Sequence, residues 1–441
     1  MARKISLPLN ALSPIHISSR KYLVFNETYD FIPATTLRGT LASIVCENEN
    51  KWQCEECGKR GSCNFEQIFN NKRVRFRNLY PVASDLYEKS FVLPATAVSC
   101  KRCPGFLSEF YYELSQGKRD FCDEVPHGVF DLLIPSLAYQ IMGRYDYEFK
   151  CPEAGCNSKL EPFSCFYSID SNDISLEISD DIIYDKVLIN ADVTKRRLVR
   201  AAINRERRTT QENLLFSLEA IEEGNQFFGE INIEDDGLAS IVKEYLDNIE
   251  SRRLGGIRSR GFGSFEFYPD ISSEFDTEVK KRILAFNHHL EVYLKNLNGF
   301  DKQGIYFTLG LQSDAILKNR NGEYSVLIDE DILSEHLNAF ISKLNITGLK
   351  LVKWSTSQSN SLGWSGTWKM PKAIESAIKS GSIFVFKVDE LNDDLIKGLE
   401  ELQMWGIGEK CEEGFGDVII CDEFHYGFHE IDQCYNDKWR Y

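Results

Sequence analysis

Hydrophobic and polar positions alternate in two stretches of the chain, at residues 5–9 and 305–311. In the first stretch Ile5, Leu7 and Leu9 are separated by single residues, and the second stretch restarts the pattern at Ile305 and Phe307. Successive side chains of a strand point to opposite faces of a sheet, so each stretch predicts a strand. The restart indicates that the second half of the chain repeats the fold of the first.

A helix, a glycine-rich loop and a strand follow one another in both halves. Apolar residues at helical spacing in residues 238–249 precede the loop 255–263, and those in 395–402 precede the loop 406–416. Both loops end in Gly-Phe-Gly at the start of a short apolar strand. This duplication predicts an α+β fold with two ferredoxin-like, or RRM-like, domains in tandem.

The same pattern sets the expected domain boundaries. We expect the first domain at residues 1–270, a helical linker at 271–300 and the second domain at 301–441. Within the first domain, residues 34–45 predict a helix that a threonine caps and that has an apolar stripe. A cysteine-rich insertion is expected at about 46–165.

Thirteen cysteines bring in the first candidate chemistry. In a reducing compartment, clustered cysteines indicate metal binding before disulfides, and paired cysteine knuckles suit tetrahedral zinc. The sequence therefore predicts one or two structural Zn²⁺ ions, with buried thiols that bind no metal as the alternative. The expected ligands form two clusters: Cys46, Cys54, Cys57 and Cys63, then Cys100, Cys103, Cys151 and Cys156. Cys122 or Cys165 could replace a ligand, and a weaker zinc-like pattern comprises Cys421, His425, His429 and Cys434.

Composition narrows the class of protein. A hydrophobic content of 43% and an aromatic content of 12% exclude extensive disorder in a chain of 441 residues. The longest mostly apolar stretch, residues 129–142, is shorter than the roughly 18 residues of a membrane span. Polar residues and prolines interrupt the apolar run after Lys4, so no secretory signal is visible and we expect a cytoplasmic protein.

Charge is negative overall but positive in places. A net charge of −16 argues against a protein that coats nucleic acid by bulk charge alone. Basic residues nevertheless concentrate at 72–77 (where they surround Val74 and Phe76 on a predicted strand), at 195–208 and in the first glycine loop. Glycines beside arginines let the backbone approach a phosphate closely, although a charge run can also be only a solvated face. A nucleotide-binding Rossmann or P-loop is excluded, because its glycines follow a strand and precede a helix.

Several motifs resemble the repeat-associated mysterious protein (RAMP) superfamily of CRISPR systems. Residues 31–41, FIPATTLRGTL, are similar to the family signature YIPGSSLRGAL, and both glycine loops resemble the glycine-rich loop of the family. Residues 201–205 with 214–216, residues 311–317 and residues 363–371 are similar to segments of type III subunits, the last two to the large two-domain subunit of type III-D. The resemblance covers most of the chain.

The resemblance implies a non-catalytic subunit of a type III, III-D-like, effector complex. Such a subunit would hold the repeat-derived 5′ handle of the CRISPR RNA and contact target RNA only indirectly. It would dock the large polymerase-nuclease subunit and other RAMP backbone subunits. The residues expected at the RNA are Thr36, Arg38, Lys195, Arg196, Arg197, Arg205, Arg208, Arg253, Gly255, Gly256, Arg258, Arg260, Gly261 and Gly263.

Two departures from the family leave alternatives open. Ala34 stands where the family has glycine, which puts close approach of RNA there in doubt. Asp30 abuts the motif where the cleaving backbone subunits carry a catalytic aspartate in a preceding loop. The alternatives are a ribonuclease that uses Asp30 or His16, and a subunit that caps the 3′ end of the guide.

Overall fold

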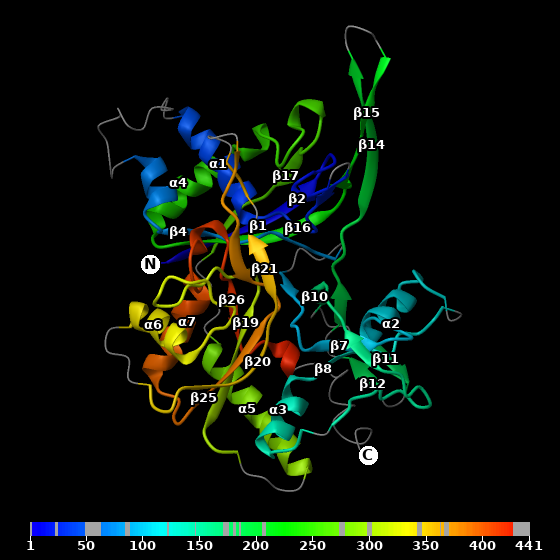
Figure 1. Ribbon diagram of the computed structural model, residues 1–441, viewed down its shortest axis with the longest axis vertical. Helices are drawn as coiled ribbons and strands as arrows, with labels where there is room; N and C mark the ends of the chain where they lie inside the picture. The colour runs from blue at the N-terminus through cyan, green and yellow to red at the C-terminus, as the bar shows by residue number, and fades with distance from the viewer. Residues whose placement is uncertain are drawn as a thin grey trace.

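The computed structural model describes residues 2–22, 25–48, 63–83, 89–120, 123–145, 147–170, 176–179, 182–184, 187–204, 209–272, 278–297, 302–341, 346–361, 363–365 and 370–426. Two antiparallel sheets lie one above the other in Figure 1, and helices cover one side of each. No helix in these ranges combines the length and the apolar character of a membrane-spanning segment.

The upper sheet and its helices form what we call the first module. Its strands follow the order β17-β1-β16-β4, with β18 beside β1 and β5 beside β16, and every pair is antiparallel. Helices α1 and α4 pack on this sheet and on each other. The elements are β1 (Arg3–Ala11), α1 (Ala34–Asn48), β4 (Val74–Phe76), β5 (Tyr80–Pro81), β16 (Gln226–Ile233), α4 (Asp236–Leu246), β17 (Phe265–Phe267) and β18 (Asp270–Ser272).

The lower sheet and its helices form the second module. Its strands follow the order β20-β25-β19-β26, and again every pair is antiparallel. The elements are β19 (Ile305–Leu311), α6 (Glu330–Phe340), β20 (Lys350–Ser355), β25 (Ile383–Val388), α7 (Asp393–Trp405) and β26 (Val418–Ile420).

The two modules have the same connectivity. Each runs strand, helix, strand, strand, helix, strand, and in each the first and third strands lie at the centre of the sheet. The second helix of each begins with a side-chain cap, since Asp235 accepts from the Leu238 N–H and Asn392 from the Leu395 N–H. Between the modules, in the range expected for a helical linker, runs α5 (Val279–Asn296). The duplication predicted from the glycine loops is therefore present in the backbone.

The first helix shows why the apolar stripe could be read from the sequence. Leu37, Leu41, Ile44 and Val45 are all buried on one side of α1, as predicted. Burying each such side chain contributes about 1.5–3 kcal/mol. The predicted threonine cap is wrong, because the N–H of Ala34 donates to the side chain of Asn78 at 2.9 Å.

The cysteine-rich region is not one continuous insertion. Strand β4 lies inside the expected range of 46–165, yet it returns to the first sheet and pairs with β16. The long excursion comes after β5 and forms three small sheets, β13-β10-β6, β8-β7-β9 and the two-stranded β11-β12. Its elements are β6 (Ser90–Val92), β7 (Ala97–Cys100), α2 (Leu107–Ser115), β8 (Val129–Asp131), α3 (Leu133–Ile141), β9 (Leu160–Pro162), β10 (Phe166–Asp170), β11 (Leu176–Ser179), β12 (Ile182–Tyr184) and β13 (Val187–Asn190). We call this part the insertion.

A long β-ribbon follows the insertion and rises along the right side of the molecule (Figure 1). It consists of β14 (Lys195–Asn204) and β15 (Thr209–Ile221). Two short strands, β2 (Ser18–Lys21) and β3 (Phe25–Thr28), extend its sheet to the order β14-β15-β3-β2. The second module carries a shorter excursion at the same position of its fold, with β21 (Gln358–Ser361), β22 (Trp364–Ser365), β23 (Met370–Pro371) and β24 (Glu375–Ile378).

Each module has its own hydrophobic core. One core joins α1 and α4 to the first sheet, and the other joins the second sheet to α5, α6, α7 and also α3 of the insertion. A third, smaller core lies in the insertion and includes Phe424 from the second module. The insertion is thus packed against the second module, although it is inserted in the sequence of the first.

Candidate RNA-binding surface and metal centre

The first glycine loop is held in a shape that only glycine permits at two positions. Gly255 and Gly263 have φ of +77° and +86°, and a Cβ on either would lie 2.4 Å or less from a backbone oxygen of His16 or Leu254. Two backbone hydrogen bonds close the loop on the end of the first strand, from Gly256 to His16 and from Gly263 to Pro14. Between these anchors, residues 258–260 form a single 3-10 turn on the surface.

The second glycine loop repeats this geometry bond for bond. Gly416 donates to Asp314 and Glu409 donates to Ile316, as Gly263 and Gly256 do in the first loop. The left-handed residue before the 3-10 turn is Ile257 in the first loop and Lys410 in the second. The match predicted from Gly-Phe-Gly is therefore confirmed at the level of single hydrogen bonds.

The two loops differ in what surrounds them. The turn 258–260 of the first loop projects Arg258 and Arg260 into solvent. The turn 411–413 of the second loop packs on α1 and β4 of the first module. There Gly414 lies against the fully buried Ala34, where a Cβ would come within 2.4 Å of the Ala34 side chain. Only the first loop therefore presents its turn to a ligand.

Arg38 belongs to this contact between the modules. Its guanidinium donates to the Phe69 carbonyl at 2.7 Å, lies 5.3 Å from the centre of the Phe69 ring and is 3.6 Å from the Glu413 carboxylate. Thr36 lies two residues earlier, and its carbonyl accepts from the Thr40 hydroxyl at 2.9 Å. The contacts of Arg38 join α1 to the second glycine loop. The guanidinium is therefore bound within the protein and is not directed toward the first glycine loop.

Three cations of the basic strand β14 have partners within the chain. Lys195 forms an ion pair with Asp30, Arg196 pairs with Glu223 at 2.8 Å, and Arg197 lies 4.4 Å from the centre of the Phe25 ring. Arg253 of the glycine loop donates to the carbonyl of Arg258 at 2.9 Å and so braces the turn from within. Arg205 and Arg208 lie outside the described residues.

The two candidate catalytic residues are both engaged. His16 is only 4% exposed, and its ring nitrogens contact the Glu219 carbonyl at 2.6 Å and the Asn26 side chain at 3.1 Å. Burial lowers the pKa of His16 below its usual value. Asp30 is exposed and paired with Lys195. His16 is thus a residue that ties the glycine loop to β3 and β15.

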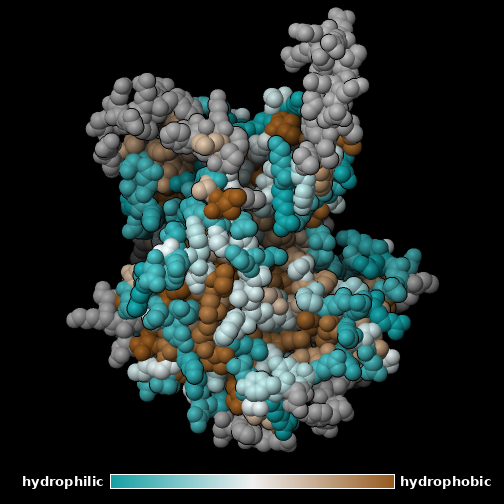
Figure 2. All heavy atoms as spheres, viewed as in Figure 1, coloured by the Kyte–Doolittle hydropathy of each residue, from teal (hydrophilic) through white to brown (hydrophobic). Residues whose placement is uncertain are grey.

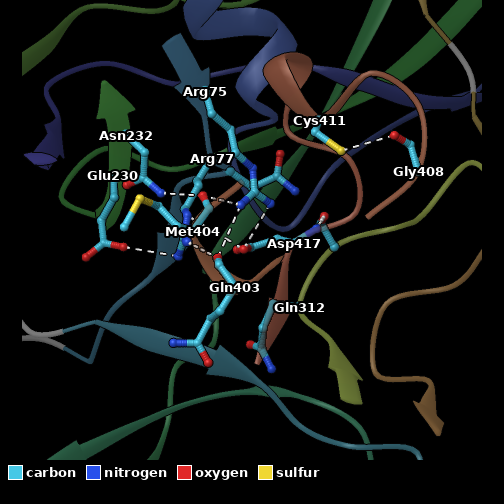
Figure 3. Close-up of polar contacts among 12 residues, drawn as sticks. Arg75, Arg77, Glu230, Asn232, Gln312, Gln403, Met404, Gly408, Cys411 and Asp417 are labelled. Carbon is cyan, nitrogen blue, oxygen red and sulfur yellow. Dashed lines mark hydrogen bonds and ion pairs between the residues drawn. The ribbon is translucent and has the colours of Figure 1, made fainter. Parts of the chain in front are cut away.

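The arginines of β4 are not a solvated face or an RNA contact. Arg75 is 2% exposed and donates to the Met404 carbonyl at 2.7 Å and to Asp417 at 3.2 Å, both in the second module (Figure 3). Arg77 donates to the Gln403 carbonyl at 2.8 Å and lies 3.3 Å from Glu230. Arg75 and Arg77 therefore lie at the interface between the modules, because these partners are more than 300 residues away in the sequence.

Glu230 shows how strongly charged this interface is. Burial alone would raise the pKa of Glu230, but Lys89, Arg77 and Lys4 together bring it well below its usual value. Lys4 and Lys89 approach its carboxylate to 3.2 and 3.3 Å. The buried charges are thus paired across the sheet of the first module.

Four side chains of the insertion lie close enough to share a metal ion. The ligand atoms of Cys100, His127, Cys151 and Cys156 all lie within 4.8 Å of one another, the one such group in the part of the chain that the structure describes. The sulfurs of Cys100 and Cys156 are 3.6 Å apart, and His127 Nδ1 is 3.2 Å from the Cys151 sulfur. A tetrahedral Zn²⁺ with Zn–S bonds of about 2.3 Å requires edges of about 3.8 Å, so the donor set fits.

The local structure positions these four ligands. Cys100 ends β7, and His127 precedes β8, which pairs with β7. Cys151 and Cys156 lie on a tight turn with Gly155 at φ +78°. Hydrogen bonds from Ser158 lower the pKa of Cys156 to about 6, which favours the thiolate that binds metal.

The predicted ligand set needs one correction. Cys103 is not among the four grouped residues, and His127, which the spacing of the cysteines did not indicate, is. The Cys103 carbonyl accepts from the His127 N–H at 2.9 Å, so the Cys100–Cys103 knuckle still orients a ligand. The sequence signal that could have indicated His127 as a ligand is its position, with Gly128, just before the apolar strand β8.

The other cysteine patterns are less complete. Cys46 lies on α1 and Cys63 precedes a π-helical turn, whereas Cys54 and Cys57 lie outside the described residues. Cys421 and His425 do not join a group of possible ligands among the described residues, and His429 and Cys434 lie outside them. His425 is instead fully buried, with Nδ1 2.5 Å from Asp131.

The Asp131–His425 pair gives the first testable prediction. Burial alone would lower the pKa of His425, but the carboxylates of Asp131 and Asp422 raise it. A raised pKa in the folded state stabilises the fold below pH about 6.5, and this contribution is lost as the pH rises further. Burial raises the pKa of Asp422, so stability that comes from its protonated form is also lost as the pH rises. Asp131→Asn should lower the melting temperature at pH 6 and flatten its fall between pH 6 and 8.

Calorimetry at the two pH values measures this effect. Asp393→Asn, at a carboxylate whose side chain is 95% exposed, is the matched control and should leave both melting temperatures unchanged. A wild-type melting temperature that rises from pH 6 to pH 8 would contradict the assignment of a charged His425.

Comparison with known proteins identifies the family. The family model described as the RAMP superfamily matches residues 9–266, which is more than half of the chain. A comparison with curated proteins finds no match.

Solved structures similar to the chain include three chains of the type III-B Cmr-beta complex. In the complex bound to cognate target RNA, the similar chain is 14% identical with a TM-score of 0.30, over 61% of this chain and 97% of its own. In the complex bound to target RNA and AMPPnP, the similar chain is 12% identical with a TM-score of 0.33, over 90% of this chain and 93% of its own. In the apo complex the similar chain is 13% identical with a TM-score of 0.29, over 61% of this chain and 96% of its own.

Proposed function

Because this chain belongs to the RAMP superfamily, we propose that it is a non-catalytic, RNA-binding subunit of a type III CRISPR effector complex. In this role it holds the repeat-derived 5′ handle of the CRISPR RNA, and it docks the large polymerase-nuclease subunit beside other RAMP subunits. The observation that carries the proposal is the contrast between the two glycine loops. One presents Arg258 and Arg260 to solvent, whereas the turn of the other packs against α1 and β4 of the first module.

The geometry of the first loop suits a phosphate. Glycines at positive φ remove the side chains that would keep a backbone away, and arginine donates to phosphate through a planar fork. On the face that Figure 2 shows, the hydrophobic areas on the lower half of the molecule are larger than those on the coloured part of the upper half. This supports RNA at the first module and protein partners at the second, even though the net charge is −16.

The duplicated connectivity supports two ferredoxin-like domains within the expected ranges 1–270 and 301–441. The order of the strands places the first and third at the centre of each sheet, as that fold requires. The second module covers the face of the first that carries α1, Ala34 and β4. A subunit whose own second half occupies this face is suited to one end of an assembly, which favours a role at the guide terminus.

The non-catalytic role rests on the state of the candidate residues. His16 is buried with both ring nitrogens engaged, and Asp30 is paired with Lys195. A general acid or base needs to reach the RNA with a free proton site, which this His16 does not offer. Unchanged cleavage of target RNA by a complex that carries Asp30→Ala would support the scaffold, and lost cleavage would favour the ribonuclease.

A structural Zn²⁺ in the insertion is part of the same proposal. Cys100, His127, Cys151 and Cys156 would hold it, and the ion would fix the β8-β7-β9 sheet against the second module. A closed Cys3His set has no open position for catalysis, which agrees with a structural role.

The second prediction tests the RNA contact. Arg258→Ala with Arg260→Ala should weaken binding of the purified chain to a single-stranded handle RNA about 10- to 100-fold, since hydrogen bonds to charged groups contribute about 1.5–3 kcal/mol. The slope of log K against log salt should become less steep by about 1.4, or about 0.7 for each lost phosphate contact. Titrations at a series of salt concentrations measure both quantities.

A matched control removes the same charge elsewhere. Lys281 and Arg320 have side chains 75% and 72% exposed, and their double alanine variant should bind RNA like the wild type. Equal loss in both double variants would mean that bulk charge, and not the loop, binds RNA. Crosslinks from the chain to the 3′ end of the guide, within the purified complex, would overturn the assignment to the 5′ handle.

A further inference from the structure

Strand β2 forms an open edge beside the first glycine loop. In the sheet β14-β15-β3-β2, β2 is the last strand, and its residues Ser18, Arg20 and Lys21 are exposed. Tyr22 follows directly and is 51% exposed. The edge therefore carries an aromatic ring beside two cations.

The tyrosine is backed by a fixed aromatic and a fixed arginine. The rings of Tyr22 and Phe25 are within 8° of parallel, with centres 6.4 Å apart, and the Tyr22 N–H donates to the Phe25 carbonyl at 2.8 Å. The guanidinium of Arg197 lies 4.4 Å from the centre of the Phe25 ring and donates to the Ser217 hydroxyl at 3.2 Å. These contacts hold the aromatic pair in place before any ligand binds.

One buried residue connects this edge to the glycine loop. The carbonyl of His16 accepts from the Gly256 N–H at 2.8 Å, while its ring contacts the Asn26 side chain on β3 at 3.1 Å. Asn26 in turn accepts from the Ser18 hydroxyl on β2 at 2.6 Å. The edge and the loop are thus parts of one rigid surface.

We propose that Tyr22, supported by Phe25 and Arg197, is a stacking platform for one unpaired base of the RNA whose phosphates bind Arg258 and Arg260. Arg20 and Lys21 contact the phosphates that flank this base. This inference rests on the proposed function and deepens it, because it names single-stranded RNA with an exposed base as the ligand. Exposed aromatic rings bind unpaired bases by stacking whatever the base, and neighbouring cations hold the backbone.

The charge and the chemistry of the edge favour RNA over a protein strand. An edge strand can pair with another chain, but cations on the edge oppose such pairing. The same cations attract a polyanion, and a tyrosine ring offers a flat face together with a hydroxyl that tolerates water. A partner protein on this edge is the alternative outcome of the test.

The experiment combines a protein variant with RNA that lacks single bases. The full-length chain is titrated with the single-stranded handle RNA and with a set of oligonucleotides that each carry one abasic position. For the wild type, one abasic position should weaken binding about 10-fold, as expected for one stacked base. Tyr22→Ala should weaken binding of the intact RNA by a similar factor and add no further loss with that one abasic RNA. Tyr22→Phe and Tyr22→Trp should restore tight binding.

A matched control comes from the second module. Tyr324 is 42% exposed and has Lys318 5.3 Å from the centre of its ring, so Tyr324→Ala removes a similar side chain and should not change RNA binding. Arg20→Ala with Lys21→Ala provides a second test, because it should lower affinity and reduce the salt dependence while keeping the effect of the abasic position.

The outcomes separate this inference from the proposed function. If the arginine variants of the glycine loop weaken binding and Tyr22→Ala does not, the platform is refuted and the RNA-binding role stands. If Tyr22→Ala weakens binding by the same factor on every abasic RNA, its role is not stacking and the inference is overturned. If the wild type does not bind single-stranded RNA at all, the proposed function itself fails.

Discussion

Removal of the Zn²⁺ that we propose for Cys100, His127, Cys151 and Cys156 should unfold the β8-β7-β9 sheet of the insertion and loosen its contact with the second module. The four candidate ligands come from the end of β7, from His127 two residues before β8 and from the turn 151–156, so a bound ion would join three segments. Structural zinc contributes about 10–16 kcal/mol to small zinc-dependent folds at pH 7. We therefore expect this to be one of the two largest effects of any single change in the chain.

The effect should reach the second module through one strand. His127 precedes β8, and β8 ends at Asp131, whose carboxylate contacts the buried His425. Phe424 packs in the core of the insertion, beside Val129 and Tyr167. Amide hydrogen exchange after chelation should accordingly lose protection in residues 97–100 and 129–131, and also in residues 420–426.

Two variants decide which side chains hold the ion. His127→Ala should lose the metal, whereas Cys103→Ser should retain one ion per chain, measured by elemental analysis of the purified protein. The opposite result, with metal lost only in Cys103→Ser, would contradict the ligand set of Cys100, His127, Cys151 and Cys156. Full protection after complete removal of metal would contradict the structural role.

The secondary structure that the sequence predicted is the part that local patterns determine. The alternation in residues 5–9 and 305–311 and the helical stripe of α1 depend on neighbours in the chain, and each was confirmed. The glycine loops were equally readable, since positive φ and close backbone approach leave glycine as the favoured residue. The duplication of the two modules could be predicted for the same reason, because both glycine loops carry the same local pattern.

What the sequence did not reveal were contacts between distant segments. Arg75 looked like one of several surface cations, because nothing near it in the sequence indicates that Asp417 lies 3.2 Å away. His127 was missed because it is not part of a cysteine knuckle. The second glycine loop gave one overlooked signal: Glu412 and Glu413 stand where the first loop has Ser259 and Arg260, which suits contact with Arg38 and not with phosphate.

Arg75→Ala should lower the free energy of unfolding by about 3–5 kcal/mol, as the loss of one partner from a buried ion pair does. The guanidinium satisfies the carbonyls of Gln403 and Met404 and the carboxylate of Asp417 in a site that is 2% exposed. Its removal leaves these acceptors buried with fewer donors and opens the interface between the modules (Figure 3). Urea unfolding, followed by fluorescence and circular dichroism together, measures the change.

Arg73 supplies the matched control on the same strand edge. Its side chain is 37% exposed and pairs with Glu234 and Asp235 at the surface, so Arg73→Ala should change stability by at most about 1 kcal/mol. Arg75→Lys should remain destabilised, because an ammonium on a flexible stem does not reproduce the fork that reaches three acceptors. Equal stability of the Arg73 and Arg75 alanine variants would contradict a buried interface. Arg75→Met with Asp417→Leu should recover part of the loss, since an apolar pair of similar volume fills the site and removes the carboxylate that has lost its arginine partner.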